Sequence, residues 1–379
     1  MSGTARQNDL SPSKQAGHSA RGGERRKGSP APVLITGGAG FIGTNLAHRL
    51  LSAGRTVRII DNLSRPGVGQ NLKWLHDQHG DQVQAKIADV REPRKWREFL
   101  QGVSQVFHFA AQVAVTTSLT DPLQDFESNL RGTLAVLEAL RALPDPPPLL
   151  FTSTNKVYGS LLDLPLRRNG TRYEPADRPL TESGIPETHP LDFQSPYGCS
   201  KGAADQYVID YARIFGLKTV VFRMSCIYGP HQFGTEDQGW IAHFLIRALR
   251  GQPIIVYGDG MQVRDALFVD DLVDAFLMAQ EKMGLLSGQA FNIGGGPGRT
   301  LSLVELLGLI SRMHGRKPAV TGEKWRPGDQ RYYVTDFGKF QAATGWSPRV
   351  GIEEGLSRLH AWLLSSGLFS PPVEAKGRG

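Results

Sequence analysis

Tyr197 and Lys201 form the first reactive pair in this sequence, within the stretch Ser-Pro-Tyr-Gly-Cys-Ser-Lys at residues 195–201. Ser195 is a good N-cap and Pro196 a good first helical residue, so the stretch predicts a helix with both reactive side chains on one face. The Lys201 ammonium, the positive helix end and an oxidised nicotinamide would all lower the tyrosine pKa from its usual value of about 10. Tyr197 is therefore a candidate general base. The alternative is a buried tyrosine beside a solvated lysine.

Thr154 is a second candidate catalytic residue. It follows an apolar run at residues 149–153 that reads as a strand. A hydroxyl at the carboxyl end of a parallel strand faces the crevice where ligands bind. Thr154 could hydrogen-bond a sugar hydroxyl and help to pass its proton to Tyr197. Ordinary capping by a loop threonine is the competing interpretation.

A glycine-rich turn predicts where a dinucleotide binds. Gly37, Gly40 and Gly43 stand between an apolar run at 33–36 and an apolar-periodic segment from residue 41. The first glycine permits a sharp turn, the second lets a pyrophosphate approach backbone N–H groups, and the third allows close packing of helix on strand. The helix N-terminus adds unpaired N–H groups and a positive dipole end. The candidate cofactor-binding residues at this turn are Gly37, Gly40, Phe41, Ile42 and Gly43.

The ends of the next strands indicate which dinucleotide is bound. Asp61 closes the second expected strand, where a carboxylate accepts hydrogen bonds from ribose hydroxyls and repels a 2′-phosphate. This favours NAD over NADP. Asp89 closes the third strand and could reach the adenine amino group. Further candidate cofactor contacts are Asn62, Val90, Ala110, Ala111 and Gln112, together with Tyr197 and Lys201.

These residues must be positioned by alternating strands and helices. Alternation implies right-handed βαβ units and a parallel sheet. After about residue 226 the alternation weakens, which predicts a second, mixed lobe. The expected fold is therefore α/β: a Rossmann-type doubly wound parallel sheet with a smaller mixed α/β substrate-binding lobe. The expected strands are 33–36, 56–61, 84–88, 105–109, 149–153, 219–223, 253–257 and 263–268, and the expected helices are 41–53, 93–101, 122–143, one from Pro196, 239–250, 270–282, 302–314 and 351–365.

The expected domain organisation has four parts. Residues 1–30 are a disordered basic tail and 31–225 an NAD-binding domain. Residues 226–366 are mainly the substrate lobe, interleaved with the first domain, and 367–379 form a second disordered tail.

The positive charge of the chain lies largely in its first segment. The formal net charge is +7, but residues 1–30 alone hold six basic residues against Asp9 and Glu24. The remaining body is close to balanced, so we expect no nucleic-acid partner. No apolar run reaches the length of a membrane span, and no secretory signal precedes the body, so we expect a cytoplasmic protein without a membrane partner. Cys199 and Cys226 form no Cys-x-x-Cys pair, and no metal site is expected.

Taken together, four motifs resemble the extended short-chain dehydrogenase/reductases, which act on nucleotide sugars. The motifs are TGGAGFIG (36–43), DNLSR (61–65), STNKVYG (153–159) and SPYGCSK (195–201), and the resemblance covers essentially residues 32–365. It implies bound NAD and a catalytic group of Thr154, Tyr197 and Lys201. It also implies a homodimer or higher homo-oligomer paired through the helices at 122–143 and 196–215.

A narrower resemblance is to the CDP-paratose (CDP-tyvelose) 2-epimerases within that family. The segments at 192–207, 210–216, 237–240 and 262–265 carry it, together with the long insert before Tyr197. The family's 4,6-dehydratases have Asp-Glu after the catalytic Thr, whereas this chain has Asn155-Lys156, so dehydration is not expected. Cys226 replaces an Asn that contacts substrate in relatives. The resemblance implies substrate contacts by Thr154, Asn155 and Cys226, and by Arg264 and Arg326 on the diphosphate.

The sequence therefore predicts an NAD-dependent epimerase of a nucleotide sugar. The expected reaction is CDP-paratose to CDP-tyvelose at carbon 2, through a transient 2-keto sugar. A UDP-hexose 4-epimerase is an alternative that assays with both substrates would separate. A catalytically silent NAD-binding sensor or scaffold is the other, and failure to turn over any nucleotide sugar would favour it.

Overall fold

The computed structural model describes residues 31–326 and 328–367. Residues 31 onward form one compact unit. The two tails expected at 1–30 and 367–379 lie outside the described residues, apart from Gly367.

A seven-stranded, fully parallel sheet forms the centre of this unit, in the order β3-β2-β1-β4-β5-β8-β12. The order reverses between β1 and β4, so a crevice opens at the carboxyl ends of these strands. The Rossmann-type fold expected from the alternating pattern is confirmed. The strands are β1 (Val33–Thr36), β2 (Val57–Asp61), β3 (Val83–Ile87), β4 (Gln105–His108), β5 (Leu149–Thr154), β8 (Thr219–Met224) and β12 (Gln289–Ile293).

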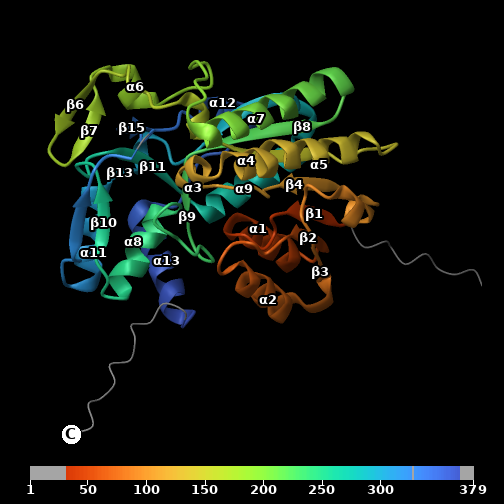
Figure 1. Ribbon diagram of the computed structural model, residues 1–379, viewed down its shortest axis with the longest axis horizontal. Helices are drawn as coiled ribbons and strands as arrows, with labels where there is room; N and C mark the ends of the chain where they lie inside the picture. The colour runs from red at the N-terminus through yellow and green to blue at the C-terminus, as the bar shows by residue number, and fades with distance from the viewer. Residues whose placement is uncertain (1–30, 327, 368–379) are drawn as a thin grey trace, which may run out of the picture. The chain divides into compact units, whose positions relative to one another are not determined.

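Apolar side chains on both faces of the sheet explain why helices cover it twice. In β1, Val33 and Ile35 join one core, whereas Leu34 joins the other. Figure 1 shows α5 and α7 on one face, and α1 and α2 on the other. The helices of these layers are α1 (Phe41–Ser52), α2 (Val68–His79), α3 (Val115–Thr120), α4 (Pro122–Phe126), α5 (Gly132–Arg141), α7 (Ser195–Phe215), α9 (Val269–Glu281), α10 (Met283–Leu286) and α12 (Gly338–Thr344).

Two expected helices are interrupted, and the helices α2, α3, α6 (Arg178–Ser183), α10 and α12 were not predicted. The segment at 93–101 forms two 3₁₀ turns, because Trp96 breaks the helix with φ −140° and is fully buried. The segment at 122–143 contains a π-helical stretch, Glu127–Arg131, between α4 and α5. Helix α2 starts at a glycine with no side-chain cap, so it lacks a clear start signal in the sequence.

The helix that carries the reactive pair begins as the sequence predicts. Helix α7 starts at Ser195, which has a positive φ of 63°. Its hydroxyl accepts the N–H of Gly198 at 3.2 Å, whereas the preceding Gln194 makes no side-chain cap. Ser195 therefore caps this helix, and Tyr197 lies in its first turn.

The remaining elements form smaller sheets and their helices. Strand β11 pairs with β13, β15 and β9, while β10 pairs with β14 and β6 with β7. Strand β12 returns from this region to the edge of the large sheet beside β8, so the two parts are interleaved. The strands are β6 (Leu166–Asn169), β7 (Arg172–Pro175), β9 (Cys226–Tyr228), β10 (Ile254–Tyr257), β11 (Val263–Phe268), β13 (Thr300–Ser302), β14 (Val320–Glu323) and β15 (Tyr332–Tyr333), and the helices are α6 (Arg178–Ser183), α8 (Trp240–Leu249), α11 (Leu303–His314) and α13 (Ile352–Ser365).

Candidate active site

A cavity of about 830 Å³ opens at the carboxyl ends of the central strands. The glycine turn forms one part of its wall, and the first turn of α7 forms another. The loop before α8 contributes a third part. Among its lining residues are Gly37, Gly40, Phe41, Ile42, Gly43, Asp61, Asn62, Arg65, Asp89, Val90, Ala110, Ala111, Gln112, Ser153, Thr154, Asn155, Lys156, Tyr197, Lys201, Cys226, Gln238 and Trp240.

The three candidate catalytic side chains meet in this cavity. The Thr154 hydroxyl acts on Tyr197 and lowers its pKa, and both residues are 8% exposed. Lys201 lies one turn along α7, where its ammonium donates to the carbonyl of Thr152 at 2.7 Å. The ammonium also lies 4.2 Å from the ring centroid of Phe151. The end of β5 and the start of α7 therefore bring two distant sequence motifs together.

Burial dominates the protonation of this group. It raises the pKa of Tyr197 to about 12 and lowers the pKa of Lys201 to about 7, although Asp205 and Asp125 oppose the change at Lys201. The groups that lower the pKa of Tyr197 are the Thr154 hydroxyl and the Arg65 guanidinium. Lys201, which the sequence predicts to lower the Tyr197 pKa, is not among these groups, and desolvation outweighs the groups that do lower it.

A buried polar network behind the catalytic residues had no clear signal in the sequence. Asp125 is 1% exposed and accepts hydrogen bonds from Ser200 at 2.5 Å, Gln112 at 2.8 Å and Asn129 at 3.1 Å. Asn129 lies in the π-helical stretch and accepts the N–H of Gln112. Such local widening of a helix is frequent at functional sites. The network fixes the α4 segment against α7 beside Lys201.

The glycine turn is too tight for side chains. A Cβ at Gly37 would lie 2.6 Å from the amide nitrogen of Ala110, and a Cβ at Gly43 would lie 2.5 Å from the carbonyl oxygen of Gly37. Gly40 precedes α1 without a side-chain cap. The start of this helix therefore faces the cavity with backbone N–H groups that suit a pyrophosphate.

Two further observations show that the cavity fits NAD. The Asp61 carboxylate accepts the N–H of Ala39 at 3.1 Å and of Leu63 at 2.8 Å, and each oxygen keeps acceptor capacity for a ribose hydroxyl. Burial raises the pKa of Asp61. The hydroxyl of Ser153 is buried at the cavity wall without a hydrogen-bond partner. A bound group would satisfy it.

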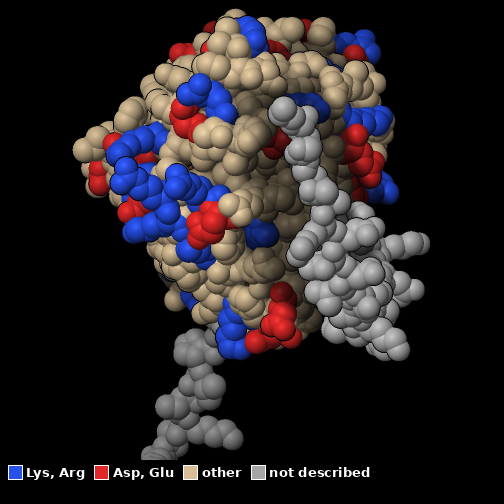
Figure 2. Space-filling view, turned by 90° about the vertical axis from the view of Figure 1, so that its right-hand side faces the viewer, with Lys and Arg blue, Asp and Glu red and all other residues tan. Residues whose placement is uncertain are grey.

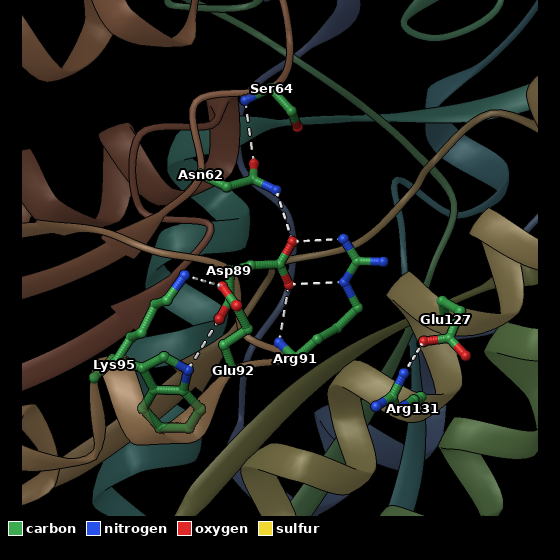
Figure 3. A network of polar contacts seen from close by, with 9 residues as sticks. Asn62, Ser64, Asp89, Arg91, Glu92, Lys95, Glu127 and Arg131 are labelled. Carbon is green, nitrogen blue, oxygen red and sulfur yellow. Dashed lines mark hydrogen bonds and ion pairs between the residues drawn. The ribbon is translucent and has the colours of Figure 1, made fainter.

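Asp89 has a different environment from the one expected. Its carboxylate is held by the guanidinium of Arg91 through bonds of 2.9 and 2.8 Å, and Asn62 donates to it at 3.3 Å (Figure 3). These bonds lower the pKa of Asp89, with the Arg91 hydrogen bond as the largest cause. Asp89 lines the cavity, but Arg91 occupies much of its acceptor capacity. The adenine contact predicted for Asp89 remains a prediction.

The predicted substrate residues separate into two groups. Asn155 and Cys226 line the cavity, and burial raises the pKa of the Cys226 thiol. Arg264 and Arg326 are not among the lining residues. Arg264 pairs with Asp329 at 2.7 Å, and Arg326 pairs with Glu236 at 2.9 Å.

Besides Arg91, which pairs with Asp89, two cavity cations were missed as site residues. Arg65 lies in the loop after β2 and lines the cavity. Its guanidinium donates to the side chain of Gln238 at 3.3 Å. Lys156 lies two residues after Thr154. Nothing in the sequence distinguishes either side chain from an ordinary solvated cation, because their burial depends on the loop before α8 and on the 328–330 segment.

Two absences hold for the described part of the chain. No cluster of three metal-binding side chains occurs there. None of the helices in residues 31–326 and 328–367 combines the length and apolar character that a bilayer crossing requires.

The sequence comparison defines the class of protein. The model of the NAD dependent epimerase/dehydratase family matches residues 33–294. The chain belongs to this family, and its cofactor is NAD.

Relatives within the family indicate the kind of reaction. The chain is 42% identical over 344 residues to the CDP-paratose 2-epimerase of Salmonella typhi, a match that covers 88% of this chain and 99% of the relative. It is 32% identical over 357 residues to a dTDP-glucose 4,6-dehydratase of Xanthomonas campestris, covering 89% and 94%. The UDP-glucose 4-epimerase of Thermotoga maritima, solved with UDP-glucose, is 30% identical with a TM-score of 0.75, covering 88% and 99%. The chain is thus an NAD-dependent nucleotide-sugar epimerase.

Proposed function

We propose that this enzyme converts CDP-paratose to CDP-tyvelose by inverting carbon 2. The observation that carries the proposal is the 42% identity, over 99% of its length, to a CDP-paratose 2-epimerase. The cavity supports it, because the dinucleotide turn and the Thr154, Tyr197 and Lys201 side chains line one continuous space.

In the proposed mechanism, the glycine turn and Asp61 would hold NAD, which would supply the reversible hydride-transfer chemistry that interconverts the alcohol and the ketone at carbon 2. Tyr197 acts as general base towards the hydroxyl on carbon 2, and Thr154, which acts on Tyr197 in the cavity, relays or orients the proton. Tyr197 returns the proton in the second half of the reaction. The sugar turns within the cavity between the two halves.

Lys201 has two roles in this proposal. Its ammonium holds the nicotinamide ribose and adds positive charge beside Tyr197. Asp125 and Asp205 favour the charged form of Lys201 against burial. An oxidised nicotinamide held there would add positive charge that favours the phenolate, which burial alone disfavours.

An isotope experiment tests the reaction. CDP-paratose deuterated at carbon 2 is expected to give CDP-tyvelose that keeps the label, because the hydride never exchanges with water. Loss of deuterium to solvent would contradict the mechanism and indicate proton abstraction from carbon. A parallel assay with UDP-glucose tests the second candidate, a UDP-hexose 4-epimerase, which the 30% identical Thermotoga structure favours.

We further propose that residues 226–366 mainly bind the nucleotide sugar, and that the enzyme works in the cytoplasm, where NAD and nucleotide sugars are available. We also propose a homodimer. Helices α4 and α7 pack together and expose large apolar side chains that a second copy would cover. These side chains are Leu123, Phe126, Tyr207, Ile214 and Phe215, which are 44–69% exposed.

A further inference from the structure

Lys156 places a second cation at the wall of the cavity. It lies in the turn that follows β5, and its backbone N–H donates to the Thr154 hydroxyl at 3.2 Å. Its ammonium donates to the carbonyl of Gly328 at 3.2 Å. An ammonium carries three N–H donors, so this contact leaves donors for a ligand in the cavity.

The charges around Lys156 do not balance. Arg264, Asp329 and Cys226 are the charged or titratable groups that act on it. The Asp329 carboxylate is already paired with Arg264 at 2.7 Å. Throughout 31–326 and 328–367, no ion pair includes Lys156. Two cations and one carboxylate therefore leave one positive charge in excess.

The backbone around Lys156 is fixed from both sides. Asn155 donates to the side chain of Gln330 at 3.3 Å, and Gln330 donates to the carbonyl of Gly159 at 2.7 Å. Gln330 is fully buried. The turn therefore holds the Lys156 stem in place, which reduces the entropy lost when the ammonium binds a ligand.

We propose that Lys156 binds a phosphate of the substrate's nucleoside diphosphate. This inference rests on the proposed function only for the substrate class, a nucleotide sugar. An ammonium at a cavity wall without a counter-charge attracts an anion, and phosphate oxygens supply both charge and acceptors. Arg264 is less free for this task, because Asp329 and the carbonyl of Val263 already hold its guanidinium.

The inference gives a defined pH dependence. Burial lowers the pKa of Lys156 to about 8, Arg264 lowers it as well, and Asp329 and Cys226 oppose the change. Phosphate binding needs the ammonium form. Affinity for a diphosphate is therefore expected to be full well below pH 8 and to fall as the pH rises through about 8.

Calorimetric titration of the NAD-loaded enzyme with CDP, UDP and cytidine tests the proposal. Lys156→Met is expected to weaken CDP and UDP binding by about 10- to 100-fold, the size of one charge-assisted hydrogen bond. Cytidine binding should not change. The decline in CDP affinity above about pH 8 should be present in the wild type and absent in Lys156→Met. Lys73→Met, which removes a 75% exposed side chain on α2, is the matched control.

Two results would overturn the proposal. If Lys156→Met binds CDP as tightly as the wild type but loses turnover, Lys156 contacts the sugar and not the diphosphate. If Lys156→Met loses its bound NAD, Lys156 contacts the cofactor and not the substrate. The titrations need no turnover, so failure of the 2-epimerase reaction is recognised separately. An enzyme that acts on another nucleotide sugar would still show the Lys156 effect with CDP or UDP.

Discussion

At the scale of single residues, the site combines a tyrosine and a lysine whose pKa values burial moves in opposite directions. Burial raises the pKa of Tyr197 to about 12 and lowers the pKa of Lys201 to about 7. Without added positive charge, desolvation keeps the phenol protonated near neutral pH. An oxidised nicotinamide bound here would therefore also add positive charge to a cavity where charge is poorly screened.

Replacement of the base is the direct test at this scale. Tyr197→Phe removes the hydroxyl and is expected to lower kcat by about 10²- to 10⁴-fold, the usual contribution of general acid–base catalysis. Bound NAD, measured by absorbance after release, should be unchanged. Tyr207→Phe, on the same helix but 44% exposed, is the control and should retain full turnover. Near wild-type activity of Tyr197→Phe would remove this residue from its role.

At the scale of elements, a buried ion pair ties the catalytic helix to the sheet. Asp205 of α7 accepts two bonds from Arg223 of β8, at 2.9 and 3.0 Å. Arg223 also donates to Tyr158 at 3.2 Å, and Tyr158 donates to Asn292 of β12 at 2.7 Å. Asp205 lies one turn beyond Lys201. The network thus sets the position of α7 relative to the end of β5.

Loss of one partner from this pair should be costly. The two side chains are 5% and 1% exposed, so Asp205→Ala leaves a buried guanidinium without a counter-charge. We expect the free energy of unfolding to fall by about 3–5 kcal/mol. Urea denaturation measures the change. Asp77→Ala, which breaks an exposed pair on α2, should cost less than about 1 kcal/mol. A small effect of Asp205→Ala would show that the pair does not hold α7.

At the scale of the whole molecule, the surface carries both charged areas and exposed apolar side chains. Figure 2 shows Lys and Arg beside Asp and Glu on the visible face, with large uncharged areas between them. This face therefore carries both signs of charge. The exposed apolar side chains of α4 and α7 instead suit a second copy of the chain.

A single charge should separate the proposed dimer. Ile214 is 62% exposed near the end of α7, well away from Lys201. Ile214→Glu would bury a carboxylate at the interface and is expected to give a monomer in size-exclusion chromatography with light scattering. Leu364→Glu, on α13 and 56% exposed, should leave the oligomeric state unchanged. A monomeric wild-type enzyme would contradict the proposal.

Much of the fold could be read from local pattern. Eight strands and the first helix were predicted to within about two residues, because apolar runs, glycine turns and caps are local signals. The strands β6, β7, β9, β12, β13, β14 and β15 were not predicted. The π-helical stretch at Glu127–Arg131 could not be predicted in this way. It depends on hydrogen bonds from Asn129 to Asp125 and Ser200, which are distant or unmarked in the sequence. Helix α2 lacked a capping signal, and strand β12 depends on pairing with β8.

The sequence by itself determined the dinucleotide turn, the Thr154, Tyr197 and Lys201 group and the family, because each requires particular residue types at fixed spacing. Only the tertiary structure decided protonation and charge balance. It buried Tyr197 and Lys201, engaged Arg264 and Arg326 with carboxylates, and left Lys156 without one. The physical reason is that desolvation and ion pairing depend on neighbours from other elements, and these neighbours meet only when the chain folds.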